Sequence, residues 1–244
     1  MPIASMPAAR LLGLLDLTSL GEDDTPDRIR ALCAAARTPH GLPAAVCVYP
    51  EHVTAAREAL AGTAVKVATV VNFPDGGDDP QRIARETRRA IAAGADEIDM
   101  VLPWRALRAG DAARARAGVD ACRAACGPDI GLKLILETGE LAEPALIRQA
   151  SELGLDAGVD FLKTSTGKVP VNATADAAAV MLDAIAGRGG RCGFKAAGGI
   201  RTPADAQVYL DLAQARLGDG WVDPARFRIG ASALFDAILA EAGG

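Results

Sequence analysis

The sequence predicts an α/β fold in which eight parallel strands close into a (β/α)8 TIM barrel. Short apolar or β-branched segments recur eight times along the chain, and segments with helical periodicity separate them. The length of 244 residues is also typical of one such barrel. Because no linker, low-complexity segment or shift in composition divides the chain, we expect a single barrel domain over residues 1–244.

The predicted strands begin with "LLGLLDLT" and end with "RFRIGAS". In chain order they cover residues 11–18, 44–50, 65–74, 97–103, 131–138, 160–166, 192–199 and 226–232. Each has the apolar or β-branched composition of a buried parallel strand. An open doubly wound sheet is the alternative, but no GxGxxG motif follows the first strand, and eight similar units favour closure.

Helical periodicity is clearest in the Ala/Arg/Glu-rich segments 80–94, 144–154 and 204–218. Two helix starts carry an additional signal. Thr25 precedes Pro26, and Thr202 precedes Pro203, so that in each pair the threonine is an N-cap and the proline takes the first helical position. These signals place helices between the predicted strands.

The charge and the N-terminal segment argue against nucleic-acid and membrane partners. A formal net charge of −5 gives no general attraction to polyanions, so an anionic substrate needs a local site. The apolar run near the N-terminus has no early basic residue and is interrupted by Asp16, well short of a spanning or secretory length. We expect a soluble cytoplasmic protein. The sequence does not fix its oligomeric state, and a homodimer is compatible with it.

The cysteines and histidines predict neither disulfides nor a metal centre. The five cysteines are an odd set without a secretory signal: Cys33, Cys47, Cys122, Cys126 and Cys192. The spacing of Cys122 and Cys126 is helical, which favours reduced thiols. His40 and His52 belong to neither an HxH nor an HExxH pattern, so a catalytic metal site is not expected.

Lysine is rare in this chain, and the few lysines lie in or close to the predicted strands. The sequence has 21 arginines and 5 lysines, and the lysines lie within or just after predicted strands: Lys66, Lys133, Lys163, Lys168 and Lys195. Only an amine can lose its proton near neutral pH and attack a carbonyl. For Lys66 and Lys133, an ordinary ion-pairing role is as well supported as a role in amine chemistry. Lys163 and Lys195 lie in apolar strands, and their position favours amine chemistry.

Alternation along the strands predicts which of these side chains meet. Lys133 and Glu137 share a face of their strand, and neighbouring strands can bring further charged residues to the same lumen. The expected lumen group is balanced: Asp16, Asp99 and Glu137 against Lys133, Lys163 and Lys195. Because Lys163 and Lys195 come from adjacent strands, each disfavours protonation of the other. A lysine kept neutral in this way is a nucleophile; the alternative is a structural layer of ion pairs.

Glycine-rich loops follow the last three predicted strands, with the sequences "TSTGK", "AAGGIR" and "GAS". Glycines allow the backbone to approach an anion, and a helix N-terminus offers unpaired N–H groups. In this fold the loops after strands seven and eight commonly bind phosphate. We therefore expect Lys168, Gly198, Gly199 and Ser232 to bind a phosphate monoester.

The chain resembles the deoxyribose-phosphate aldolase family over nearly its whole length. The matching segments include "VCVYP", "VATVVNFP", "ADEIDMVLPWRAL", "LKLILETGEL", "DFLKTSTGKVPVNAT" and "GFKAAGGIRT". The resemblance implies a class I aldolase without metal or organic cofactor, whose small-molecule substrates are a phosphosugar and aldehydes. It implies that Lys163 forms the imine, that Lys195 perturbs Lys163, and that Asp99 acts as acid and base through a water molecule.

The resemblance also implies a set of substrate- and phosphate-binding residues. These are Asp16, Thr18, Cys47, Lys133, Thr166, Gly167, Lys168, Gly198, Gly199, Arg201, Gly230 and Ser232. Three departures accompany it. Ala196 stands where many relatives have proline and is expected to loosen the turn after Lys195. Ala233 stands where a second serine is common. Some members use a C-terminal tyrosine as a proton relay, but this sequence ends in "LAEAGG", so we expect no such relay.

Two other functions remain open from the sequence. One is a Schiff-base aldolase of the same fold that acts on a ketose phosphate. The other is a non-catalytic barrel that binds a phosphosugar, although such a protein has no need for two lysines in its lumen.

Overall fold

The computed structural model describes residues 7–242, and in it eight parallel strands form a closed barrel in the order β1 to β8. The strands are β1 Leu15–Thr18, β2 Ala45–Val48, β3 Lys66–Val71, β4 Glu97–Val101, β5 Gly131–Ile135, β6 Phe161–Lys163, β7 Gly193–Ala197 and β8 Phe227–Ala231. Each strand pairs with the next in sequence, and β8 returns to pair with β1. The predicted TIM barrel is confirmed.

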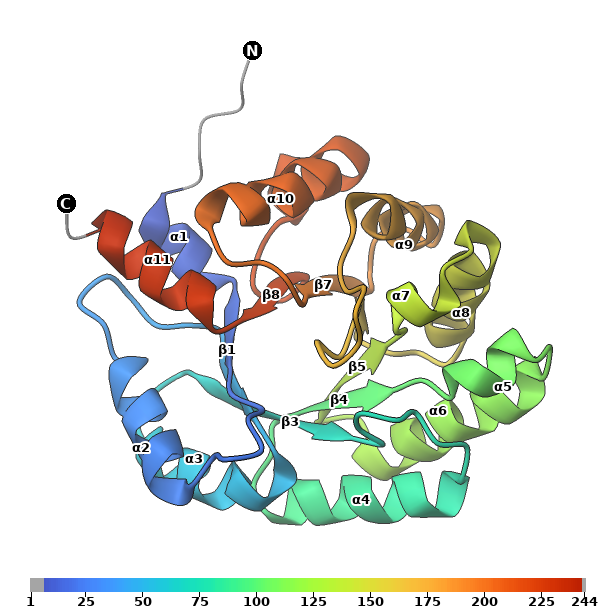
Figure 1. Cartoon of the computed structure of the whole chain (residues 1–244), viewed down its shortest axis with the longest axis horizontal. Helices are drawn as coiled ribbons and strands as arrows, with labels where there is room; N and C mark the ends of the chain where they lie inside the picture. The colour runs from blue at the N-terminus through green and yellow to red at the C-terminus, as the bar shows by residue number, and fades with distance from the viewer. Residues whose placement is uncertain (1–6, 243–244) are drawn as a thin grey trace.

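Helices surround the barrel and cover its outer face (Figure 1). They are α1 Ala8–Gly13, α2 Pro26–Ala35, α3 Val53–Ala59, α4 Pro80–Ala92, α5 Trp104–Arg108, α6 Ala112–Cys126, α7 Thr138–Leu141, α8 Pro144–Asp156, α9 Ala175–Gly187, α10 Pro203–Leu217 and α11 Ala233–Ala242, with the short 3-10 helices η1 Pro50–His52 and η2 Asp219–Trp221. The main hydrophobic core lies between the strands and these helices.

The helix starts follow from local chemistry. The hydroxyl of Thr25 accepts a hydrogen bond from the backbone N–H of Arg28 at the start of α2, as predicted. Thr202 caps α10 in the same way, and the carboxylate of Asp205 accepts a hydrogen bond from the backbone N–H of Thr202, which completes a capping box. These contacts satisfy N–H groups that the first turn of a helix leaves without partners.

The first predicted strand is too long at its start. Residues 11–13 belong to helix α1, and the strand begins only at Leu15. Leu11 and Leu12 are both buried, and α1 lies beside α11 (Figure 1). A short apolar run is compatible with a buried helix as well as with a buried strand, and periodicity alone does not separate the two. The sixth strand is also shorter than predicted, because it ends at Lys163 and leaves Thr164 to a loop.

Strand register places the charged residues of the lumen next to one another. Asp99 on β4 is opposite Lys133 on β5, and Lys195 on β7 lies between Lys163 on β6 and Arg228 on β8. The intervening residues of these strands point outward into the main core. On the other side of the lumen, β2 and β3 contribute a cluster of small apolar residues: Ala45, Cys47, Ala68 and Val70. The charged half of the lumen therefore faces an apolar half.

Candidate active site

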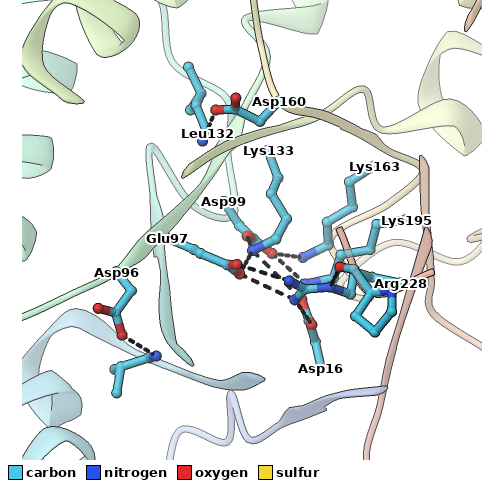
Figure 2. A network of polar contacts seen from close by, with 12 residues as sticks. Asp16, Asp96, Glu97, Asp99, Leu132, Lys133, Asp160, Lys163, Lys195 and Arg228 are labelled. Atoms are coloured by element: carbon cyan, nitrogen blue, oxygen red, sulfur yellow. Dashed lines mark hydrogen bonds and ion pairs between the residues drawn. The ribbon is translucent and has the colours of Figure 1, made fainter. Parts of the chain in front are cut away.

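Seven charged side chains meet inside the barrel (Figure 2). The network consists of Asp16, Glu97, Asp99, Lys133, Lys163, Lys195 and Arg228. Six different strands supply these residues, and each residue is at most 8% exposed. Buried charges need partners, because an unpaired ion in a protein interior loses its hydration without compensation.

Asp99 is the centre of this network. Its Oδ1 accepts a hydrogen bond from Lys133 Nζ at 2.8 Å. Its Oδ2 accepts from Lys163 Nζ and from Lys195 Nζ, both at 2.7 Å. The reactive amine that the sequence suggested and its neighbouring lysine therefore share a single carboxylate oxygen.

Asp16 and Glu97 hold the remaining cations. Asp16 accepts a hydrogen bond from Lys195 through Oδ2 and another from Arg228 Nη1, at 2.7 Å, through Oδ1. Glu97 pairs with Lys133 Nζ at 2.6 Å and with Arg228 Nη2 at 3.1 Å. Neither Glu97 nor Arg228 was predicted from the sequence. Glu97 could have been found from its position two residues before Asp99 on one strand, and Arg228 from its place inside β8.

The environment separates Lys163 from the other cations of the network. Burial lowers the pKa of Lys163; Asp99 opposes this effect, and the positive charge of Lys195 adds to it. Burial acts in the same direction on Lys195, but Asp16 and Asp99 outweigh it and raise the pKa of Lys195. Asp99 and Glu97 likewise raise the pKa of Lys133 against the effect of burial. Lys163 is therefore the lysine of the network that most readily loses its proton.

The carboxylates at the centre stay ionised. Burial alone would raise the pKa of Asp99, but Lys133, Lys163 and Lys195 lower it well below its usual range. Asp16 is shifted in the same direction, because Lys195 and Arg228 outweigh the effect of burial on its pKa. Cys47 behaves differently: burial and the charge of Asp99 raise the pKa of its thiol, which therefore stays protonated.

A pocket of about 300 Å³ opens at the C-terminal ends of the strands, with Lys163 as the network residue in its lining. Ten of the predicted site residues line it: Thr18, Lys163, Thr166, Gly167, Lys168, Gly198, Gly199, Arg201, Gly230 and Ser232. The other five predicted residues, Asp16, Cys47, Asp99, Lys133 and Lys195, are buried in the lumen. The pocket thus connects the solvent with one amine of a buried charged network.

The outer part of this pocket has features that suit an anion. Gly198 and Gly199 have φ angles of 90° and 84°, in the left-handed region that favours glycine. Because glycine has no side chain, their backbone is open to the pocket. Helix α11 starts at Ala233, directly after Ser232, so the N–H groups of its first turn lie at the pocket. Lys168 is exposed at this rim, where its Nζ donates to the backbone carbonyl of Leu20 at 2.7 Å.

The prediction for Glu137 is wrong. Strand β5 ends at Ile135, and Glu137 takes a left-handed backbone conformation with φ 58° before helix α7. Alternation along the strand therefore no longer determines its direction. Its carboxylate accepts hydrogen bonds from the backbone N–H of Thr166 at 3.1 Å and from the Thr166 hydroxyl at 2.6 Å. Glu137 ties the loop after β6 to the loop after β5 instead of neutralising a lysine.

The structure also decides the roles of Lys66 and Lys133 and the expected effect of Ala196. Lys66 is exposed at the start of β3 and is an ordinary surface lysine, whereas Lys133 belongs to the buried network. Ala196 lies within β7, where it is paired with Ile229 of β8. No turn follows Lys195 directly, so the expected loosening at Ala196 has no structural basis.

The glycine loop after β7 allows a matched pair of substitutions. A Cβ at Gly198 would lie 2.6 Å from the side chain of Asn172, whereas a Cβ at Gly199 would meet no atom within 4 Å. Both positions have a positive φ, which costs an alanine about 1–2 kcal/mol. We expect Gly199→Ala to lower the free energy of unfolding by about that amount and Gly198→Ala to lower it further, with a raised KM for phosphorylated substrate. Denaturant unfolding and steady-state kinetics measure both effects, and equal losses of stability would contradict the steric argument.

The described part of the chain offers few other functional features. All five cysteines are buried and free. Within residues 7–242 no group of three or more His, Cys, Asp or Glu side chains is arranged to hold a metal ion. No helix in the same range has the length and apolar composition needed to cross a membrane.

Comparisons with known proteins point to one family. The model of a family described as DeoC/LacD family aldolase matches residues 11–239. A protein from Coccidioides immitis, provisionally named a deoxyribose-phosphate aldolase, is 30% identical with a TM-score of 0.85, and the match covers 98% of this chain and 88% of that one. A protein from Toxoplasma gondii with the same provisional name is 27% identical with a TM-score of 0.85, over 97% and 93% of the two chains. The deoxyribose phosphate aldolase from Aeropyrum pernix, at 22% identity and a TM-score of 0.71 over 96% and 92%, supports the fold alone.

Proposed function

Because the chain belongs to the DeoC/LacD family of aldolases, we propose that it is a deoxyribose-phosphate aldolase. The reaction is the reversible cleavage of 2-deoxy-D-ribose 5-phosphate to D-glyceraldehyde 3-phosphate and acetaldehyde, in deoxyribonucleoside catabolism. The observation that carries this proposal is the placement of Lys163, a buried amine with a lowered pKa at the inner end of a pocket with glycine-rich walls. Metal and organic cofactors have no part in the proposed reaction.

Imine formation begins with the neutral amine of Lys163. Its nitrogen attacks C1 of the open-chain sugar, which gives a carbinolamine. Lys195, whose pKa is raised, holds a proton beside Lys163 and donates it to the departing hydroxyl group, which leaves as water. The product is a protonated imine on Lys163, and Asp99, 2.7 Å from the lysine nitrogen, stabilises its positive charge.

Cleavage then breaks the C2–C3 bond. The C3 hydroxyl loses its proton, C3 becomes the aldehyde carbon of glyceraldehyde 3-phosphate, and the bonding electrons form an enamine between C2, C1 and the lysine nitrogen. Asp99 alone is a weak base, because its ion pairs lower its pKa. We therefore propose that Lys195, which is neutral after the first step, accepts the proton of the C3 hydroxyl. Asp99, which contacts Lys195, and a water molecule carry the proton between them. Lys195 returns this proton to C2. Hydrolysis of the protonated imine then releases acetaldehyde, restores the neutral amine of Lys163 and returns a proton to Lys195.

The phosphate of the substrate is assigned to the outer part of the pocket. Gly198, Gly199, Ser232 and the first turn of α11 offer backbone N–H groups and a hydroxyl there, and Lys168 and Arg201 add positive charge. A net charge of −5 over the whole chain makes such a local cluster necessary for an anionic substrate. We place the phosphate at this rim and the aldehyde end at Lys163.

Borohydride trapping tests the proposed function. We expect acetaldehyde and sodium borohydride to add a stable ethyl group to Lys163, found by peptide mapping, and the protein to cleave deoxyribose 5-phosphate in the presence of EDTA. Ketose phosphates are the control substrates. Trapping by a ketose phosphate but not by acetaldehyde would indicate a different aldolase of this family, and no trapping by either would leave a binding protein. A loss of activity in EDTA that zinc restores would contradict the cofactor-free reaction.

A further inference from the structure

We propose that Arg228 on β8 keeps Lys163 uncharged, because it gives the buried network one positive charge more than its carboxylates can balance. Arg228 acts through Asp16 and Glu97 and is a positioning residue, not one that touches the substrate. This inference rests on the proposed function in one respect, namely that the amine of Lys163 is the reactive group.

The network has one basic side chain more than it has carboxylates. The network has three carboxylates, on Asp16, Glu97 and Asp99, and four basic side chains, on Lys133, Lys163, Lys195 and Arg228. All seven are buried. If every group were ionised, one positive charge would remain without a partner inside the protein, which costs several kcal/mol. Loss of one proton from a basic group removes this cost.

The basic groups of the network differ in whether they can lose a proton. A guanidinium remains charged under all conditions in which a protein is folded, whereas a lysine amine can become neutral. Arg228 is therefore a permanent charge in the network. It donates to Asp16 Oδ1 at 2.7 Å, to Glu97 Oε1 at 3.1 Å and to the carbonyl of Pro224, and its guanidinium lies 5.5 Å from the centre of the Phe161 ring. These contacts use negative charge that would otherwise stabilise protonated lysines.

The carboxylates are distributed unequally among the three lysines. Lys133 lies within 4 Å of Asp16, Glu97 and Asp99, and Lys195 bridges Asp16 and Asp99. Lys163 pairs with Asp99 and shares that oxygen with Lys195. Since Lys163 has the smallest share of negative charge, the missing proton is assigned to it.

Other groups that face Lys163 do not change this balance. Cys47 approaches it from β2, but burial raises the pKa of that thiol, so it carries no charge. Glu137 faces it from the start of α7, but the backbone N–H and the hydroxyl of Thr166 donate hydrogen bonds to its carboxylate and hold it outside the network. Asp99 from β4 and Lys195 from β7 belong to the network itself.

Arg228→Met and Arg228→Lys form the test and its matched control. Methionine removes the permanent charge at similar length and leaves each carboxylate with a lysine partner, because Lys133 contacts all three. With three carboxylates and three lysines, Lys163 can keep its proton. We expect its pKa, and the acidic limb of kcat/KM against pH, to rise by about one unit or more in Arg228→Met. A lysine at this position would lie beside both Asp16 and Glu97, whereas Lys163 shares one oxygen of Asp99. It should therefore keep its proton, and the limb should stay at its wild-type pH.

A second pair of variants tests the balance of positive and negative charges in the network. Glu97→Gln removes a negative charge and should move the acidic limb to lower pH, because the excess of positive charge increases. Combining Glu97→Gln with Arg228→Met restores an excess of one, and the limb should return towards its wild-type position. If Arg228→Met failed to fold, the shift expected for Glu97→Gln alone would still decide, since an unmoved limb in that variant contradicts the proposal.

The protonation state of Lys163 can also be measured by chemical modification, independently of catalytic turnover. The rate of its reductive methylation by formaldehyde and cyanoborohydride, followed by peptide mapping at several pH values, reports the neutral amine, with the exposed Lys66 as internal reference. We expect the midpoint for Lys163 to lie at higher pH in Arg228→Met and at lower pH in Glu97→Gln than in the wild type. In Arg228→Lys and in the double variant it should lie near the wild-type value. An unshifted midpoint in folded Arg228→Met, or an equal shift in Arg228→Lys, would overturn the proposal. Failure of wild-type trapping with acetaldehyde would instead count against the proposed function alone.

Discussion

Replacing Lys163 with methionine or with arginine is expected to abolish turnover, with a loss in kcat of about 10⁴-fold or more. Neither side chain has an amine that can form an imine, so the covalent route through Lys163 is closed. The loss should be the same for both variants although they differ in charge. Cleavage of deoxyribose 5-phosphate, measured by release of glyceraldehyde 3-phosphate, checks this result. Retention of more than trace activity by either variant would rule out the Schiff base on Lys163.

The two variants should differ in stability. Methionine replaces an amine that we expect to be largely neutral in the resting site, so the free energy of unfolding should change little. Arginine adds a permanent charge to a network whose three other cations already balance its three carboxylates, and we expect it to lower the free energy of unfolding by roughly 3 kcal/mol. Denaturant unfolding of both proteins measures the difference. The corresponding substitutions at the exposed Lys66 are the controls and should leave activity and stability unchanged.

Replacing Lys195 with leucine is expected to cause a steep loss of activity at pH 7, part of which returns at higher pH. The variant removes a positive charge that contacts Asp99 Oδ2, the same oxygen that holds Lys163. Asp99 then stabilises protonated Lys163 more strongly, and the pKa of Lys163 rises. Because the reaction needs the neutral amine, which exists above this pKa, the acidic limb of kcat/KM against pH moves upward.

The shape of the profile separates two roles of Lys195. A shift of the acidic limb reports its effect on the pKa of Lys163, whereas a lower plateau at high pH reports the loss of proton transfer by Lys195 itself. We expect both changes. Borohydride trapping with acetaldehyde at each pH follows imine formation separately from carbon–carbon cleavage. An inactive variant whose limb stays in place would contradict the electrostatic role and leave proton transfer as the sole function of Lys195.

Much of the fold could be predicted because it depends on interactions between residues near each other in sequence. Recurrent apolar segments and helical periodicity predicted all eight strands, and Thr25 and Thr202 marked helix starts that the structure confirms. The scarcity of lysine directed attention to Lys163 and Lys195, and alternation within strands correctly placed both in the lumen beside Asp99. Period-two alternation is a property of any extended backbone, so it required no knowledge of the tertiary structure.

Prediction failed beyond the ends of the strands and for contacts between residues far apart in the sequence. Alternation was applied to Glu137 beyond the end of β5, and a left-handed backbone there turned its carboxylate to Thr166. Glu97 and Arg228 join the network although 130 residues separate them, and their contact depends on closure of the barrel, which brings β8 opposite β4. The sequence determined which strands carry charged side chains. Only the tertiary structure decided how many of them meet, and therefore which cation remains without a balancing carboxylate, because the pKa of a buried group depends on every charge within a few ångströms of it.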